Sequence, residues 1–218
     1  ALAYVKGRGL TDATIEACGI GFSGRGTEAR YKDMRGEFSL YGVDPESPAG
    51  VVVLGFQGDV SGWAKSHGIP DNEVNKDWVA AGKINGLLAV PGLVYPHYYG
   101  KRLRYLSRRH LPGHDTITNA KGEKIEWKSW NPPKALAGDR QFFFNHVWHA
   151  DAQECMVVEG QMDAITLAQW GLAAIAMAGL GNKSDSLEWL KRATKKHLVI
   201  YVATDGDNPG KAGQEALA

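Results

Sequence analysis

Apolar residues in the first third of the chain are spaced for short helices that end at glycines. Residues 9–15 and 68–74 share one pattern, in which a glycine and an apolar residue precede Thr or Pro and then Asp. Each copy predicts that one helix stops at the glycine and that the next begins at a Thr cap or at a Pro in its first turn. Residues 23–50 are rich in glycine, charge and turn formers and predict loops, whereas Val51–Phe56 predicts a short strand.

The middle of the chain has the pattern of an antiparallel sheet. Residues 87–99 and 103–106 run apolar or alternate with tyrosines, and residues 117–125 have the composition of a hairpin. We therefore expect a sheet across residues 87–130, with the basic residues of this region on its strands.

From residue 154 the pattern changes to strands and helices in alternation. Such spacing predicts parallel strands joined by right-handed crossovers, and functional groups gather at the carboxyl ends of parallel strands. The expected strands are 154–159, 173–177 and 197–204, and the expected helices are 161–170, 184–196 and 210–217. The expected fold class is α/β, with an α+β N-terminal subdomain over residues 1–152 followed by a parallel βαβ domain over residues 153–218.

The size and composition of the chain fit a globular protein with a local basic segment. With 218 residues and a 44% apolar share, the chain can bury one large core or two small ones, which excludes a disordered protein. Its 25 Lys and Arg residues nearly balance 24 Asp and Glu residues, so no global field draws it to nucleic acid or membrane. Residues 101–134, however, hold 9 basic against 3 acidic residues.

The cysteines and histidines do not have the pattern of a zinc site. Cys18 and Cys155 stand far apart and form no C-x-x-C pair, so we expect no zinc in this chain and a reducing, cytoplasmic setting. His110 and His114 have ligand-like spacing but lack a cysteine pair, which favours packed or surface histidines. No apolar run approaches the roughly 20 residues of a membrane span. Both ends of the sequence resemble cuts within a domain, which suggests a fragment.

Carboxylates follow two of the predicted parallel strands. Glu159 ends the first strand and Asp163 comes about one helical turn later, while Asp205 and Asp207 flank a glycine after the third strand. Carboxylates that converge on one rim repel one another unless a divalent cation lies among them, and such hard oxygens suit Mg²⁺ or Mn²⁺. Each motif alone is an ordinary turn or polar loop, but their joint placement in one βαβ run favours a metal site.

Basic residues alternate with apolar residues in the predicted strand that starts near residue 101. On a strand, this spacing puts charge on one face above a packed face, which suits phosphate or nucleotide contact; the alternative is a solvated edge strand protected by charge. The basic residues are Lys101, Arg102, Arg104, Arg108 and Arg109.

The segments VVEGQMDAITLAQWGLAAIAMAGL and LVIYVATDGDNPGKAGQEAL resemble the TOPRIM domain, a metal-binding module with an E-G-x-x-D motif after one strand and a D-x-D motif after a later one. This version is most similar to that of DnaG-type DNA primases. Residues 4–22, the basic stretch 93–109 and the pair Pro133-Lys134 are similar to parts of the primase polymerase core. Residues 23–60 have no counterpart in this resemblance.

The resemblance implies a DNA primase that synthesises short RNA primers on single-stranded DNA by metal-dependent nucleotidyl transfer. It implies that Glu159, Asp205 and Asp207 are the catalytic metal ligands, that Asp163 contributes through water or a second ion, and that the complete enzyme holds two ions. Lys134 and the five basic residues are the implied contacts to nucleotide or nucleic acid. The implied partners are template DNA, NTPs, the RNA–DNA hybrid and a replicative helicase, in bacterial, phage or plasmid replication.

The sequence also departs from the DnaG pattern. Its TOPRIM segment is truncated at the C-terminal side, where the family continues to another strand and a further acidic pair, and it has no zinc ribbon. We therefore expect that this fragment alone primes slowly or not at all. Two alternatives stay open: another TOPRIM phosphodiester enzyme, such as a nuclease, and a non-catalytic single-stranded DNA-binding module of the replication machinery.

Overall fold

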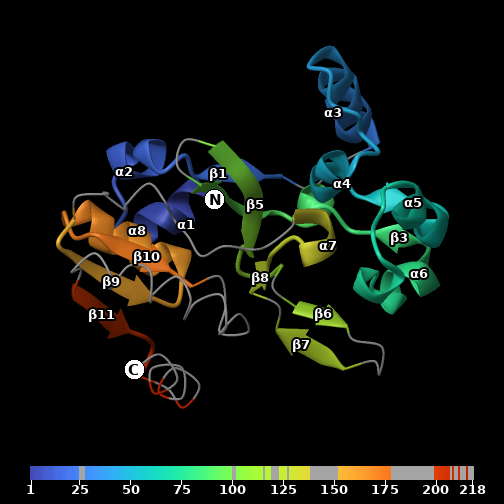
Figure 1. The fold of residues 1–218 in the computed structure, drawn as a ribbon. Coiled ribbons are helices and arrows are strands. Elements are labelled where there is room, and N and C mark those ends of the chain that lie inside the picture. The colour runs from blue at the N-terminus through green and yellow to red at the C-terminus, as the bar shows by residue number, and fades with distance from the viewer. Residues whose placement is uncertain are drawn as a thin grey trace. The chain divides into compact units, whose positions relative to one another are not determined.

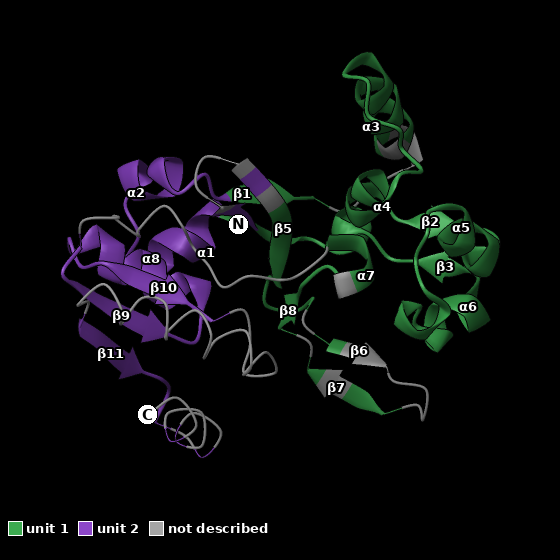
Figure 2. Cartoon of the chain, in the orientation of Figure 1, with its two compact units in different colours: residues 1, 21–94, 105–139 green, residues 2–20, 95–104, 140–218 purple. Residues whose placement is uncertain are grey.

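The fold is that of a mixed α/β chain in two compact units (Figures 1 and 2). The computed structural model describes residues 1–24, 28–99, 102–114, 116–118, 123–126, 128–137, 152–177 and 199–206, with single positions 208, 211 and 215. Unit 1 comprises Ala1, Gly21–Val94 and Tyr105–Asp139, and unit 2 comprises Leu2–Ile20, Tyr95–Arg104 and Arg140–Ala218. The domain boundary between residues 152 and 153 stays a prediction.

Unit 1 contains most of the helices and an antiparallel sheet. Its helical elements are α3 (Glu28–Leu40), α4 (Pro48–Leu54), α5 (Val60–Ser66), η1 (Asp71–Glu73), α6 (Lys76–Ala81), η2 (Leu87–Ala89) and α7 (Lys134–Ala137). Its strands are β1 (Gly21–Ser23), β2 (Phe56–Gln57), β3 (Lys83–Ile84), β6 (Thr116–Thr118), β7 (Lys124–Glu126) and β8 (Ser129–Trp130). Strands β4 (Gly92–Tyr99) and β5 (Arg102–His110) contribute residues to both units.

The predicted antiparallel sheet and hairpin are confirmed, except that Leu87–Ala89, predicted as part of the sheet, form the 3-10 helix η2. Four strands form a sheet in the order β1-β4-β5-β8, and the β1–β4 and β5–β8 pairs are antiparallel. The expected hairpin is the antiparallel β6–β7 pair, in which Ile117 lies opposite Ile125. A further two-stranded ribbon pairs β2 with β3.

The strand predicted at Val51–Phe56 is wrong, because most of these residues belong to helix α4. The side chain of Ser47 accepts a hydrogen bond from the backbone N–H of Gly50, and Pro48 stands in the first turn, where its missing N–H has no cost. A short apolar run does not by itself separate a buried strand from a buried helix, so this Ser-Pro start was the informative signal. Gly55 ends the helix with φ of 81°, a conformation that favours glycine.

The loops predicted for residues 23–50 are also wrong in part, because α3 is a helix of 13 residues. This helix is polar on nearly all sides, so its sequence lacks the apolar stripe by which a surface helix is recognised. The chain leaves α3 through Leu40 and Tyr41, whose side chains are strongly exposed.

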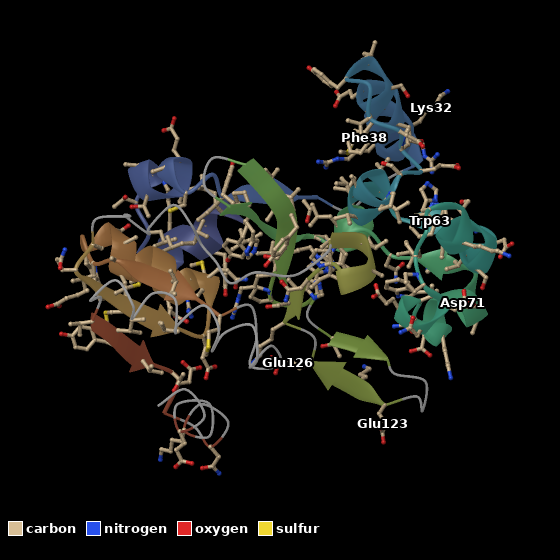
Figure 3. The ribbon with its side chains drawn as sticks, in the orientation of Figure 1. Lys32, Phe38, Trp63, Asp71, Glu123 and Glu126 are labelled. Atoms are coloured by element: carbon tan, nitrogen blue, oxygen red, sulfur yellow. The ribbon has the colours of Figure 1, made fainter. Side chains whose placement is uncertain are left out.

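The core of unit 1 is built around Trp63 of α5 (Figure 3). Its indole ring packs against Phe56 with 5.4 Å between the ring centroids, and its N–H donates to the carbonyl of Glu46 at 2.7 Å. The surrounding buried residues come from helices, the β2–β3 ribbon and the sheet: Val51, Val52, Val60, Ala64, Ile69, Ile84, Leu87, Val94, Trp130 and Leu136. Fixing the indole N–H to a carbonyl satisfies the one polar atom that this core residue buries.

A buried arginine joins the antiparallel sheet to η2. The Arg108 side chain is only 1% exposed, and its guanidinium donates to the carbonyls of Gly86, at 3.4 Å, and Leu87. Arg108 lies opposite Trp130 in the β5–β8 register, with its Cζ 5.5 Å from the indole centroid. Its second terminal nitrogen lies 2.9 Å from His110 Nε2, which must accept this bond because an arginine only donates.

The expected alternation of outward charge and inward apolar side chains therefore fails on β5. Arg108 points into unit 1, while Leu103 is 52% exposed. The buried guanidinium finds polar partners on this side of β5. They are the carbonyls of Gly86 and Leu87 and the ring of His110, and their hydrogen bonds compensate the cost of burying the charge. Gly92 of β4 makes room for it: a Cβ there would lie 2.5 Å from Arg108 Cγ and 2.5 Å from the carbonyl oxygen of Arg109.

Unit 2 is a parallel three-stranded sheet with helices, as predicted. Its elements are α1 (Leu2–Gly7), α2 (Asp12–Ala17), β9 (Glu154–Val158), α8 (Gln161–Gln169), β10 (Ala174–Ala176) and β11 (Val199–Ala203). Strand β9 is central in the order β10-β9-β11, and both of its pairings are parallel. Helix α8 packs on β9 and β10 and buries Met162, Ala164 and Ile165. The helices predicted at 184–196 and 210–217 lie outside the described residues, apart from the single positions 211 and 215.

Gln169 fastens the N-terminal helices to α8. Its side-chain oxygen accepts from the backbone N–H of Thr11 at 2.8 Å, and its amide nitrogen donates to the carbonyl of Gly9 at 3.0 Å. The first of these groups lies at the start of α2, where backbone N–H groups lack helical partners, and Thr11 also caps α2 through its hydroxyl. The side-chain amide of Gln169 thus both donates to and accepts from the backbone of the turn between α1 and α2.

Among the helices that the structure describes, none is both long and apolar enough to cross a bilayer.

Replacing Arg108 by Leu should lower the free energy of unfolding by about 2–3 kcal/mol, because two buried carbonyls and His110 Nε2 would lose a charged donor. Urea unfolding followed by circular dichroism measures this loss. The matched control is Arg109→Gln on the neighbouring, less buried position, where we expect a change within about 0.5 kcal/mol. Equal stability of the Arg108 and Arg109 variants would contradict a structural role for Arg108.

Candidate functional site

The carboxyl edge of the parallel sheet brings two of the predicted acidic motifs to neighbouring strands. Val158, the last residue of β9, lies opposite Ala203, the last residue of β11. Glu159 therefore follows one strand directly, and Asp205 follows the adjacent strand after a single intervening residue. Because parallel strands end at the same edge, the two motifs leave the sheet side by side.

Glu159 and Asp163 stand on either side of the turn into α8. Glu159 is half-buried, whereas Asp163 is exposed in the first turn of the helix. A carboxylate in the first turn of a helix interacts favourably with its free backbone N–H groups and with the helix dipole.

Backbone conformation does not require a glycine at position 160, and the space beside it is taken only by the side chain of Asp163. The Gly160 φ of −109° is open to any residue. A Cβ at this position would, however, lie 2.6 Å from Asp163 Oδ2, so the carboxylate folds back over the glycine. The glycine in the E-G-x-x-D motif thus lets Asp163 lie against the turn that carries Glu159.

The D-x-D motif is described only in part. Asp205 is exposed, and no described atom lies within 4 Å of the place where a Cβ on Gly206 would be. Asp207 lies outside the described residues. Within the described ranges, no three His, Cys, Asp or Glu side chains are grouped closely enough to hold a metal ion. The metal-ligand set Glu159, Asp163, Asp205 and Asp207 therefore stays a prediction.

The two thiols of the chain are not placed to act as ligands or nucleophiles. Cys18 and Cys155 are both free and buried. Burial raises the pKa of the Cys155 thiol on β9 to about 12 and raises the pKa of Cys18 as well. Both are therefore protonated at neutral pH, and a protonated thiol is a poor ligand and nucleophile.

The predicted basic contacts fall into three groups. Arg109 is half-buried on β5, and Arg108 is buried beside it, so Arg108 is a packing residue in this structure and does not present its charge to solvent. Arg102 and Arg104 lie on β5 and Lys134 begins α7, but the structure describes only their backbone. Lys101 lies outside the described residues.

Acidic side chains within residues 101–134 partly neutralise the positive charge of this segment. Lys128 forms a salt bridge with Glu126 of β7 at 3.2 Å, with both side chains more than half exposed. Glu126 and Glu123 both project from the β6–β7 region (Figure 3). Such exposed pairs contribute little to stability but reduce the local positive field.

Comparisons with known proteins match the C-terminal segment by sequence and nearly the whole chain by structure. Residues 156–218 match the family described as Toprim-like. The DNA primase of Escherichia coli K12 is 38% identical over 64 residues, which are 29% of this chain and 10% of that protein. The DNA primase of Salmonella typhimurium LT2 is 37% identical over 65 residues, 11% of its length.

Solved structures match nearly the whole chain. The E. coli primase catalytic core has a TM-score of 0.59 at 21% identity, and a structure described as the DnaG catalytic core has a TM-score of 0.58 at 20% identity. A DnaG primase catalytic domain bound to single-stranded DNA has a TM-score of 0.57 at 20% identity. Each match covers 98% of this chain and 56% or 57% of the solved chain, so this chain spans little more than half of those cores. Residues 156–218 are thus a Toprim-like segment, and the chain as a whole has the fold of the DnaG primase catalytic core.

Proposed function

We propose that this chain is part of the catalytic core of a DNA primase, which synthesises short RNA primers on single-stranded DNA by metal-dependent nucleotidyl transfer. The observation that carries the proposal is the placement of Glu159 and Asp205 after adjacent parallel strands inside a Toprim-like segment. Carboxylates at such an edge are suited to hold the metal ions that assist nucleotidyl transfer.

The donor set fits Mg²⁺ or Mn²⁺. Its members are carboxylates, the hard oxygen ligands that these ions prefer, and two of the four, Asp163 and Asp205, are exposed and open to a hydrated ion. In the proposal, Glu159, Asp205 and Asp207 are the principal ligands and Asp163 contributes through water or a second ion. When bound, two such ions would favour deprotonation of the primer 3′-hydroxyl and neutralise the leaving pyrophosphate.

The protein's own groups hold the carboxylates and the substrates in place. Gly160 lets the Asp163 carboxylate lie over the turn after β9, and the parallel pairing of β9 and β11 fixes where Glu159 and Asp205 leave the sheet. The proposed contacts to nucleotide and nucleic-acid phosphates are the basic residues Lys101, Arg102, Arg104, Arg109 and Lys134. Arg108 supports this strand from inside unit 1.

The proposed partners follow from the same function. They are single-stranded template DNA, NTPs, the RNA–DNA hybrid and a replicative helicase, and the proposed location is the cytoplasm. Support for the template comes from the related catalytic domain whose structure is described as bound to single-stranded DNA. The division into a core subdomain over residues 1–152 and a TOPRIM domain over 153–218 is part of the same proposal.

Substitution of carboxylates at the carboxyl edge of the sheet should weaken Mn²⁺ binding, whereas substitution of a carboxylate at the other end of the strand should not. Isothermal titration calorimetry should show at least about tenfold weaker Mn²⁺ binding for Glu159→Gln and Asp205→Asn, and a smaller loss for Asp163→Asn. Glu154→Gln is the matched control, because Glu154 lies at the opposite end of the same strand and is exposed. A Glu154 variant that loses Mn²⁺ as strongly as the Glu159 variant would refute this site.

Single-stranded DNA binding should depend on salt through the basic residues in the first half of β5. The double variant Arg102→Gln/Arg104→Gln should flatten the slope of log K against log salt by about one to two units, because each lost phosphate contact removes about 0.7 released counterions. Lys65→Gln, which removes one charge from helix α5 of unit 1, serves as the control. If the slope of the double variant equals that of the unaltered chain, the DNA path runs elsewhere.

Primer synthesis should depend on the same carboxylates in the natural full-length protein that contains residues 1–218. Glu159→Gln, Asp205→Asn and Asp207→Asn should each lower the rate by roughly 100-fold or more, with DNA affinity unchanged, because these groups stabilise charge in the transition state. Asp163→Asn should cost less. The assay follows NTP incorporation on single-stranded DNA with Mg²⁺ and scores DNA cleavage in parallel, so cleavage without incorporation would replace primase by nuclease.

A further inference from the structure

A cavity in unit 1 is lined by none of the residues of the proposed metal and phosphate sites. It has a volume of about 300 Å³ and is lined by residues of α3, the end of α4 and the β2–β3 ribbon, together with Gly86 and with Ala89 at the end of η2. Small-molecule sites range from roughly 300 to 1,000 Å³, so this cavity is of a size for one small ligand and not for a polymer. All of its lining residues belong to unit 1, whereas the carboxylates of the Toprim-like segment belong to unit 2.

The floor of the cavity is a close crossing of two backbone segments. A Cβ on Gly86 would lie 2.3 Å from the backbone nitrogen of Gly55, and a Cβ on Gly55 would lie 2.6 Å from the carbonyl oxygen of Ile84. Neither position therefore tolerates a side chain, and Gly55 also has φ of 81°. The carbonyl of Gly86 is in turn bonded to Arg108, which anchors the floor to β5. The backbone of this floor is thus fixed, whereas the polar side chains of the lining, among them Arg35 and Lys83, are exposed.

The polar lining of the cavity is cationic and neutral. Its charged residues are Arg35 of α3 and Lys83 of β3, its amides are Gln57 and Asn85, and it contains no carboxylate. Within the part of the chain that the structure describes, neither Arg35 nor Lys83 has a salt-bridge partner. Two cations and two amides with no acid favour an anion that also accepts hydrogen bonds, such as a phosphate.

The apolar lining offers a surface for a flat ring. Phe56 lines the cavity and is only partly buried, and its ring packs against Trp63 of the core at an interplanar angle of 31°. Ile84 and Leu54 add aliphatic surface beside it. A supported aromatic ring with a free edge or face is a stacking platform, and a nucleobase is a ligand that stacks without regard to its sequence.

We propose that this cavity binds a nucleoside monophosphate group, with its phosphate near Arg35 and Lys83 and its base against Phe56. The chemistry is the same whether the group is a free nucleotide or the 5′-phosphorylated end of an oligonucleotide. The site is separate from the proposed metal centre and needs no divalent ion, so its success or failure does not depend on primase activity.

Calorimetric titration of the chain with adenosine 5′-monophosphate in EDTA tests the proposal. Lys83→Gln and Arg35→Gln should each weaken binding by about tenfold, the effect expected for loss of one charge-assisted contact. Lys76→Gln on α6 and Lys32→Gln on α3 are matched controls, because both are exposed lysines of unit 1 that do not line the cavity (Lys32 is labelled in Figure 3). Unchanged binding in both Lys83 and Arg35 variants overturns the site.

Ligand dissection separates the two halves of the proposed contact. Adenosine and inorganic phosphate should each bind at least about tenfold more weakly than the monophosphate, since each lacks one half of the interaction. Equal binding of adenosine would overturn the phosphate contact, and equal binding of phosphate would overturn the stacking contact. A tetranucleotide with and without a 5′-phosphate identifies the source: stronger binding of the phosphorylated oligonucleotide than of the free nucleotide assigns the site to a nucleic-acid end, and the reverse assigns it to a free nucleotide.

Discussion

The parallel pairing of β9 on both of its edges is the constraint on which the proposed chemistry depends. Because β10 and β11 both run parallel to β9, all three strands end at one edge, and residues far apart in sequence leave the sheet next to one another. Glu159 and Asp205 are separated by 46 positions in the chain but by only one strand spacing in the sheet. Helix α8 covers β9 and β10, and Gln169 at its end holds the turn between α1 and α2. The same helix therefore supports the sheet and fixes the N-terminal segment within unit 2.

Unit 1 depends on a different kind of interaction, the buried guanidinium of Arg108. Burying a charge is costly, and it is tolerated here because the side chain donates to two carbonyls of the η2 turn and to His110, and packs on Trp130. These partners belong to β5, β8 and the segment before β4, so one side chain ties three parts of the unit together. Gly92 leaves the space that the arginine stem occupies.

The sequence predicted the features that have a clear period and missed those that depend on packing. Alternating strands and helices after residue 154 were sufficient to predict the parallel sheet, and the carboxylates at its edge followed from strand ends. Helix α4 was missed because its apolar run has no period, although Ser47 and Pro48 mark its start. Helix α3 was missed because it has almost no apolar face. The burial of Arg108 could not be predicted, since its partners are backbone carbonyls, which a sequence pattern does not reveal.

The near-zero net charge determines how such a chain can attract a polyanion. With a formal charge of +1, the protein has no long-range field to collect DNA, and salt screens exposed charges beyond about 8–10 Å. Attraction must then come from groups that contact phosphate directly, and the proposed groups are those of β5 and those beside the β2–β3 ribbon. The carboxyl edge of the parallel sheet is the opposite case in the proposal, because acids there would repel phosphate unless a divalent cation reversed the local charge. In the proposal, metal binding at that edge is therefore a condition for entry of the nucleoside triphosphate as well as for chemistry, whereas binding of a nucleotide in the cavity of unit 1 is independent of the metal.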